Sequence, residues 1–214
     1  ENLYIFKNTE GTPENIRKFH PNIIVSSTGS APLLPPITGL KDRIDNENYN
    51  IYSILGMISH INDFPKDLEG KKVVVVGGGA VGLDVVEFFA DRNADISIVE
   101  MMDQIGRDLD PVSKNDTKTM MKKHNVHQLT KTALLEVKDS SFLVKGDGEP
   151  YELPFEYGFV CLGMRAQGQL YQSLTEEFSS EDVEIMNIGD SQRARRIIDG
   201  TQEGRNILTI LEQK

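Results

Sequence analysis

The feature that most constrains the fold is a run of four valines followed at once by three glycines, at residues 73–79. A continuous valine run suits a strand that is buried on both faces, as in a parallel sheet covered by helices. An amphipathic run over about residues 80–92 and a second β-rich run, Ile96–Val99, follow the glycines. Strand, turn, helix and strand in this order predict a βαβ unit.

The glycines themselves indicate a binding turn. Gly77, Gly79 and Gly82 fit the spacing G-x-G-x-x-G, in which the first permits a tight turn, the second lets backbone approach a pyrophosphate and the third allows close helix–strand packing. The helix that opens at Ala80 and Val81 points unpaired N–H groups and its positive dipole end at such a pyrophosphate. Glycine-rich turns also occur for packing alone, but here every element of the pattern is in register. We therefore expect these five residues to bind a dinucleotide.

Two acids bear on the choice of ligand. Glu100 ends the second strand about 18 residues after Gly82, close to the spacing of about 20 expected of the acid that binds the adenosine ribose hydroxyls. A carboxylate there repels a 2′-phosphate, so NAD(H) is favoured over NADP(H). Asp84 lies in the first turns of the helix, either as a solvated acid that suits the helix dipole or as a residue lining the nicotinamide end of the site.

The segments before the valine run predict a second structural unit. Residues 1–30 contain a short apolar run at Leu3–Phe6, a helix start at Thr12–Glu14 and an apolar run at Ile23–Ser26, which predict strand, helix and strand. Three prolines in residues 31–40 predict an extended connector, because proline fixes φ and removes a backbone donor. We place a domain boundary there.

The second half of the chain predicts further β structure. A helix is expected to begin at Asp110, and three short β-rich runs between residues 133 and 163 predict an antiparallel meander. A strand in residues 183–190 and a helical region over 193–211 complete the chain. The fold class is therefore α/β, with a Rossmann-like domain that combines a parallel sheet and an antiparallel β-meander.

Composition excludes several classes of function. The net charge of −10 and the pI near 4.9 provide no basic field for a nucleic acid. No apolar run approaches the roughly 18 residues of a membrane span, and no signal-peptide pattern opens the chain, so we expect no membrane partner and a cytoplasmic location. The single cysteine, Cys161, excludes an internal disulfide framework, and the four histidines show no metal-ligand spacing.

Five sequence motifs together resemble those of a known enzyme group. They are "STGSAPLLPPITG", "VVVVGGGAVGLDVVEFFA", "VEMMDQIGRDLDP", "FVCLGMR" and "MNIGD". They resemble the pyridine-nucleotide-dependent flavoprotein reductases, with the nearest similarity to the C-terminal half of the NADH:flavin oxidoreductase, enoate reductase and 2,4-dienoyl-CoA reductase group. The resemblance covers nearly the whole chain. It implies an NAD-binding domain at 31–165, inserted within an FAD-binding domain of which 1–30 and 166–214 are two parts.

The resemblance also implies roles for individual residues. Gly163, in "CLG", would lie near bound NAD. Gly189 and Asp190 belong to the motif whose aspartate hydrogen-bonds the flavin ribitol. Thr28 and Gly29 match the alanine-threonine-glycine motif of the group, although serine replaces the alanine.

Two departures from the group set the expected scope of this chain. The glycine turn that opens such FAD domains has no counterpart, since residues 1–22 contain one glycine, Gly11. The N-terminal barrel that carries FMN and iron–sulfur cysteines is absent as well. The resemblance therefore implies a fragment of a larger enzyme, whose partners are NADH and the rest of the same polypeptide, the flavin half and the barrel; a homo-oligomer is also possible.

The expected activity follows from that resemblance. In the intact enzyme, hydride would pass from NADH to FAD and electrons onward to a distant FMN and iron–sulfur centre that acts on an enoate or enoyl-type substrate. No catalytic acid or base is expected in this chain, because the cofactors carry the chemistry. Two alternatives stay open: a flavoprotein of the NADH oxidase, ferredoxin-reductase or CoA-disulfide-reductase type, and a dinucleotide-sensing module without turnover.

Overall fold

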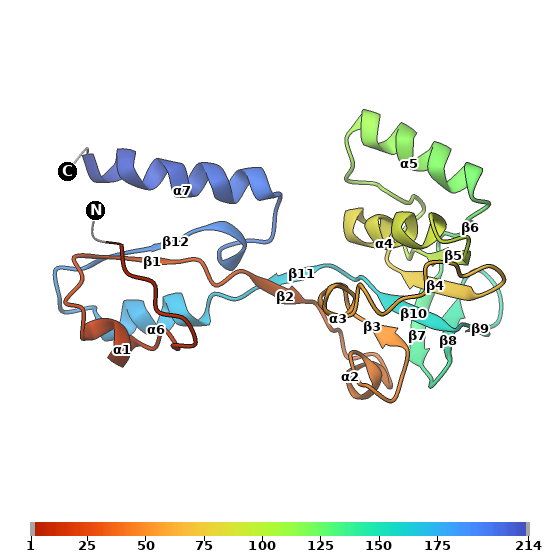
Figure 1. Cartoon of the computed structure of the whole chain (residues 1–214), viewed down its shortest axis with the longest axis horizontal. Coiled ribbons are helices and arrows are strands. Elements are labelled where there is room, and N and C mark those ends of the chain that lie inside the picture. The colour runs from red at the N-terminus through yellow and green to blue at the C-terminus, as the bar shows by residue number, and fades with distance from the viewer. Residues whose placement is uncertain (1–2, 213–214) are drawn as a thin grey trace. The chain divides into compact units, whose positions relative to one another are not determined.

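The computed structural model describes residues 3–212 and divides the chain into two compact units (Figure 1). Unit 1 combines the N-terminal segment up to Ala31 with the C-terminal segment from Met164 onward, and unit 2 is Pro32–Gly163. Two short strands, β2 (Ser30–Pro32) and β11 (Met164–Ala166), pair with each other where the chain passes between the units. The assignment of the units to flavin and NAD domains stays a prediction.

Unit 2 is built on a five-stranded sheet in which every pair is parallel, with the order β3-β10-β4-β5-β6. The strands are β3 (Ile51–Tyr52), β10 (Tyr157–Val160), β4 (Lys72–Val76), β5 (Asp95–Val99) and β6 (His127–Leu129). The central strand is the valine run, as expected of a strand buried on both faces. The predicted α/β class is confirmed.

The valines of β4 explain why the run is continuous. Val73 and Val75 pack into one apolar core together with helix α4 (Ala80–Ala90). Val74 and Val76 face the opposite side of the sheet and pack into a second core. Successive side chains of a strand point to opposite faces, so a strand with a core on each side needs an apolar residue at every position.

The second core lies between the sheet and an antiparallel meander, which Figure 1 shows on the side of the sheet away from α4. The meander consists of β7 (Ala133–Val137), β8 (Ser141–Lys145) and β9 (Tyr151–Pro154). The prediction that the whole third run, up to residue 163, belongs to it was wrong. Its second part is β10, which lies between β3 and β4, because Phe159 and Val160 pair with two of the valines and are buried in the two cores.

The remaining helices of unit 2 are α2 (Leu40–Arg43), α3 (Ile54–Ser59) and α5 (Pro111–Lys123). The helix predicted to begin at Asp110 is α5, whose first backbone N–H groups donate to the Asp110 side chain at Val112 and Ser113. This side-chain cap satisfies two of the donors that a helix start leaves unpaired.

Unit 1 is smaller and has one core. Its elements are α1 (Pro13–Arg17), β1 (Ile23–Ser26), α6 (Gln169–Glu177), β12 (Glu184–Asn187), the 3₁₀ turn η1 (Gly189–Ser191) and α7 (Ile197–Glu212). Strand β1 pairs in parallel with β12. Ile24, Leu174 and Phe178 form the core. Thr12 caps α1, as its sequence predicts.

The strand predicted at Leu3–Phe6 is not present. These residues are irregular and their side chains are 59% to 81% exposed. A strand needs a neighbour for its backbone hydrogen bonds, and none of the described residues pairs with this segment.

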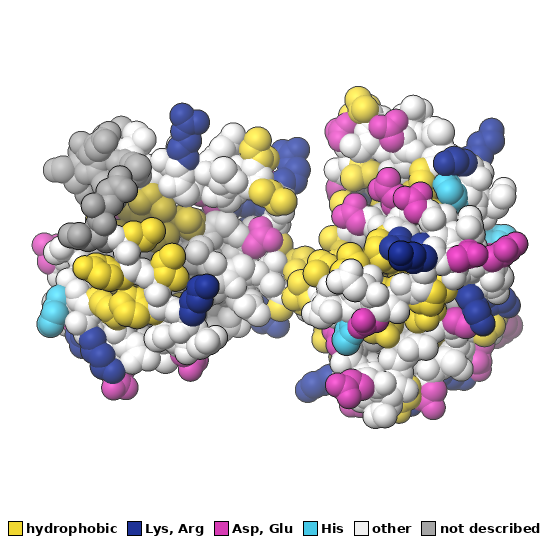
Figure 2. Space-filling view, viewed as in Figure 1, with side chains coloured by type: hydrophobic (Ala, Val, Ile, Leu, Met, Phe, Trp, Pro, Cys, Tyr) yellow, Lys and Arg dark blue, Asp and Glu magenta, His cyan; other side chains and the backbone are white. Residues whose placement is uncertain are grey.

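Charged side chains of both signs are interspersed over the visible face of unit 2 (Figure 2). Between residues 3 and 212, no helix is long and apolar enough to cross a bilayer. Over the same range, no group of three or more histidine, cysteine or acidic side chains is placed to hold a metal ion.

Candidate functional site

Unit 2 contains a cavity of about 580 Å³ at the carboxyl ends of its parallel strands. This edge of an open α/β sheet is where ligands usually bind. Its walls come from five parts of the chain: the proline-rich connector, the glycine turn with the start of α4, the end of β5, the start of β7 and the segment after β10. The lining residues are Pro35, Ile37, Val76, Gly77, Gly79, Ala80, Val81, Val99, Glu100, Met101, Thr132, Ala133, Leu134, Cys161, Leu162 and Gly163.

The three motif glycines have three different surroundings. Gly77 has φ +109°, and a Cβ there would lie 2.2 Å from the carbonyl oxygen of Cys161. A Cβ on Gly82 would lie 1.9 Å from the carbonyl oxygen of Gly77, so helix and turn touch at that point. Gly79 differs from both, because a Cβ there would meet no atom within 4 Å. The space beside Gly79 is part of the cavity and is open to a ligand.

The start of α4 presents backbone donors to the same cavity. The first helical hydrogen bond at this end of α4 runs from the Leu83 N–H to the Gly79 carbonyl, over 3.0 Å. The N–H groups of Ala80 and Val81 have no acceptor among the described residues. Unpaired N–H groups at the positive end of a helix dipole favour an anion such as phosphate.

Glu100 is held in a defined orientation at the end of β5. Its Oε2 accepts from the Gly78 N–H over 2.6 Å, and its Oε1 accepts from the Met102 N–H over 2.7 Å. The side chain is half-buried and lines the cavity. Each carboxylate oxygen can accept a second hydrogen bond, so Glu100 can still bind a hydroxyl group of a ligand.

The structure brings most of the residues predicted in unit 2 together, but not all. Gly77, Gly79, Ala80, Val81, Glu100 and Gly163 line the cavity, and Gly82 lies directly behind the turn. Asp84 lies elsewhere, on a separate cavity of about 360 Å³ that Glu87 also lines. Limited hydration of its carboxylate raises the pKa of Asp84. The roles of these residues in binding stay predictions.

Cys161 lines the cavity, but its surroundings disfavour the thiolate form that a nucleophile needs. Its side chain is buried. Burial, with a smaller contribution from the charge of Asp84, raises the pKa of the Cys161 thiol to about 12. The reactive thiolate form is therefore scarce at physiological pH.

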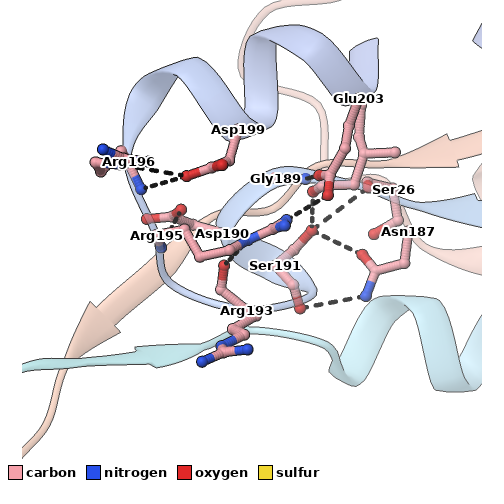
Figure 3. A network of polar contacts seen from close by, with 11 residues as sticks. Ser26, Asn187, Gly189, Asp190, Ser191, Arg193, Arg195, Arg196, Asp199 and Glu203 are labelled. Atoms are coloured by element: carbon pink, nitrogen blue, oxygen red, sulfur yellow. Dashed lines mark hydrogen bonds and ion pairs between the residues drawn. The ribbon is translucent and has the colours of Figure 1, made fainter. Parts of the chain in front are cut away.

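The predicted residues of unit 1 form a second cluster. Ser30 follows Gly29 in the sequence, and its hydroxyl donates to Asp190 Oδ2 over 3.1 Å. Gly189, at φ +65°, donates its N–H to Glu203 Oε2 over 2.7 Å (Figure 3). The Thr28 hydroxyl donates to the Gln167 carbonyl over 2.5 Å. Thr28, Gly29, Gly189 and Asp190 therefore belong to one hydrogen-bonded region of unit 1.

A polar network holds the Asp190 turn in place (Figure 3). The Arg195 backbone N–H donates to Asp190 Oδ1 over 3.1 Å, and the Arg195 guanidinium pairs with Glu203. The hydrogen bond from the Gly189 N–H, and secondly the Arg195 side chain, lower the pKa of Glu203. The network orients the Asp190 carboxylate, whose oxygens can accept further bonds from a hydroxylated ligand.

Sequence reasoning missed two parts of the cavity wall. Thr132, Ala133 and Leu134 line it, although they come from the β-meander and carry no motif. Pro35 and Ile37 line it as well, in a segment that the sequence predicts only as a connector. No local pattern could have identified these residues, because their place depends on contacts distant in sequence.

Comparison with known proteins gives a match over most of the chain. The family model of the pyridine nucleotide-disulphide oxidoreductases matches residues 5–186. The metal reductase of Desulforamulus reducens is 26% identical over 92% of this chain and 32% of its own length. The NADH oxidase of Thermoanaerobacter brockii is 26% identical over 89% of this chain and 28% of its own length.

Solved structures share the fold. A 2-naphthoyl-CoA reductase in complex with 2-naphthoyl-CoA superposes with a TM-score of 0.75 at 22% identity, over 92% of this chain and 28% of that chain. At this identity the likeness concerns the fold alone. The chain thus spans about a third or less of the length of each of these three proteins.

Proposed function

Because the chain belongs to the pyridine nucleotide-disulphide oxidoreductase family, we propose that unit 2 is the NADH-binding part of a flavin-dependent oxidoreductase. One observation carries the proposal: the open side of Gly79, the unpaired N–H groups at the start of α4 and the oriented Glu100 carboxylate all border one cavity. A pyrophosphate needs the first two, and an adenosine ribose needs the third.

In this proposal each part of NADH has its own place. The pyrophosphate lies against Gly79 and accepts from the N–H groups of Ala80 and Val81. The adenosine ribose donates its hydroxyls to Glu100. Gly163, which has φ +105° and open space beside it, lies at the nicotinamide end. NADH, when bound, supplies a hydride for the flavin, and the residues of this chain bind and orient it without acting as acid or base.

We further propose that these residues are one portion of a larger polypeptide. The chain spans 32% and 28% of the two curated relatives above. In the larger protein, Thr28, Gly29, Gly189 and Asp190 would contact FAD, and other domains would carry FMN and an iron–sulfur cluster. An enoate or enoyl-type substrate is proposed on the resemblance of the five sequence motifs to the enoate reductase group. A cytoplasmic location and self-association stay predictions.

The relative that is an NADH oxidase favours a second candidate, a flavoprotein that reduces oxygen or a protein electron acceptor. The full-length reading frame separates the two. A barrel domain with clustered cysteines beside this chain supports the enoate-type enzyme, whereas its absence supports the oxidase. A flavin-binding glycine turn in the reading frame would count against a sensing module without turnover.

The first test concerns the choice of cofactor. NADH is expected to bind about tenfold or more tightly than NADPH, because the fixed Glu100 carboxylate repels a 2′-phosphate and each tenfold step corresponds to ~1.4 kcal/mol. Calorimetric titration measures both affinities. Glu100→Ala is expected to reduce the difference between the NADH and NADPH affinities, since it removes one ribose acceptor and one repulsive charge. A preference for NADPH in the unsubstituted chain would contradict the role given to Glu100.

The second test concerns FAD. The purified chain is expected to be colourless and without reductase activity, because Thr28, Gly29, Gly189 and Asp190 can contact only part of the flavin. Between residues 3 and 212, the two segments of unit 1 contain no G-x-G-x-x-G spacing of the kind that binds a pyrophosphate at a helix start. An absorbance spectrum and a dye-reduction assay measure this. A stoichiometric flavin band, or dye reduction by NADH alone, would overturn the proposal that FAD binding needs further residues.

A further inference from the structure

The start of β7 lies directly beside Glu100. The Lys131 N–H donates to the Met102 carbonyl over 2.8 Å, and the Thr132 N–H donates to the Glu100 carbonyl over 2.9 Å. The same Met102 donates its own N–H to the Glu100 carboxylate. Lys131 is therefore fixed by its backbone next to the residue that would read the adenosine ribose.

The backbone of Lys131 has an unusual conformation for its residue type. Its φ is +51°, in the left-handed region where glycine or asparagine is favoured and other side chains are strained. The structure keeps a lysine at this position even so. Strained residues that the surrounding structure holds in place tend to cluster at ligand sites.

Glu100 and Lys131 carry opposite charges, and their side chains differ in how they are held. The Glu100 carboxylate is fixed by two backbone N–H groups. The Lys131 side chain is exposed, and within residues 3–212 its ammonium takes part in no ion pair or hydrogen bond. A free ammonium on a flexible stem is a ready partner for a phosphate.

We propose that Lys131 is a second determinant of nucleotide choice, whose ammonium attracts a 2′-phosphate on the adenosine ribose while Glu100 repels it. The inference rests on the proposed dinucleotide site and deepens it. In the unsubstituted chain, the repulsion from Glu100 outweighs the attraction from Lys131, and NADPH binds weakly. When Glu100 is neutralised, the attraction from Lys131 remains and NADPH can bind.

One other exposed cation provides a matched control. Arg107 follows Gly106, whose N–H donates to the Gly78 carbonyl, so it too is near the glycine turn. Its backbone carbonyl accepts from Lys114, but it forms no backbone bond beside Glu100. If any nearby positive charge can attract the phosphate, Arg107 and Lys131 will have equal effects.

The experiment is a calorimetric titration of NADH and NADPH into variants of this chain. In a Glu100→Gln background, adding Lys131→Gln is expected to weaken NADPH binding about five- to tenfold more than NADH binding. Adding Arg107→Gln is expected to leave the ratio of the two affinities unchanged. Lys131→Arg, which keeps the positive charge, is expected to keep the NADPH to NADH affinity ratio of the Glu100→Gln variant. A purely structural role of Lys131 would not depend on the charge of its side chain. The effect of Lys131 should shrink with added salt.

The outcomes separate this inference from the proposed function. If the unsubstituted chain is folded but does not bind NADH, both fail. If NADH binds and Lys131→Gln changes the NADPH to NADH ratio no more than Arg107→Gln does, only the role of Lys131 is overturned. A folded Lys131→Gln variant, checked by circular dichroism, excludes loss of structure as the cause.

Discussion

Gly79→Val is expected to abolish NADH binding, with at least about a 100-fold loss of affinity, while the chain stays folded. A side chain at Gly79 meets no protein atom within 4 Å, and its φ of −79° with ψ of −178° is an extended conformation open to any residue. The valine therefore fills space that belongs to the ligand. Calorimetric titration measures the affinity, and circular dichroism with thermal unfolding measures the fold.

Gly148→Val is the matched control for that variant. Gly148 lies between β8 and β9, outside the cavity, and also has no atom within 4 Å of an added Cβ. It is expected to leave both NADH affinity and stability close to those of the unsubstituted chain. If Gly79→Val still bound NADH with unchanged affinity, the glycine turn would not be the pyrophosphate site.

The parts of the fold that the sequence predicts correctly are those whose signal is local. The segment from β4 to β5 is confirmed because valines, glycines and an amphipathic helix follow one another within about 30 residues, the length of such a unit. The resemblance to the flavoprotein reductases is confirmed by the family match over residues 5–186. Both inferences need only short motifs in the right order.

The wrong predictions share a physical cause. Leu3–Phe6 has the composition of a strand, but a strand exists only where a neighbour accepts its hydrogen bonds. Residues 157–160 continue an apparent meander in sequence, yet they leave it to pair with the valine run. Partner choice depends on contacts distant in sequence, which hydrophobic patterning does not encode.

In the candidate site, too, the features with a local sequence signal were predicted and those that depend on distant contacts were not. The glycine turn and Glu100 follow from spacing alone, whereas the wall at Thr132–Leu134 reaches the cavity only through sheet assembly. The hydrogen bonds that orient Glu100 come from Gly78 and Met102, and no sequence pattern indicates them. Sequence therefore predicts which groups bind, and the fold determines how they are held.

Gly82→Ala is expected to destabilise unit 2 by about 3 kcal/mol or more, because an added Cβ lies 1.9 Å from the Gly77 carbonyl oxygen and such overlap forces backbone to move. Helix propensity alone predicts the opposite sign, since alanine is favoured over glycine inside a helix by about 1 kcal/mol. The sign of the change thus separates close packing from propensity. Urea unfolding, followed by circular dichroism, measures the free energy.

Gly79→Ala provides the comparison, because it adds the same methyl group three residues earlier, where no atom lies within 4 Å. It is expected to lower the free energy of unfolding by no more than about 1 kcal/mol, the cost of alanine in place of glycine at the N-cap of α4. A stable Gly82→Ala variant would show that turn and helix can separate without cost. The contrast between the two variants tests whether the two glycines have different roles, Gly82 in the contact between helix and strand and Gly79 in the space for the ligand.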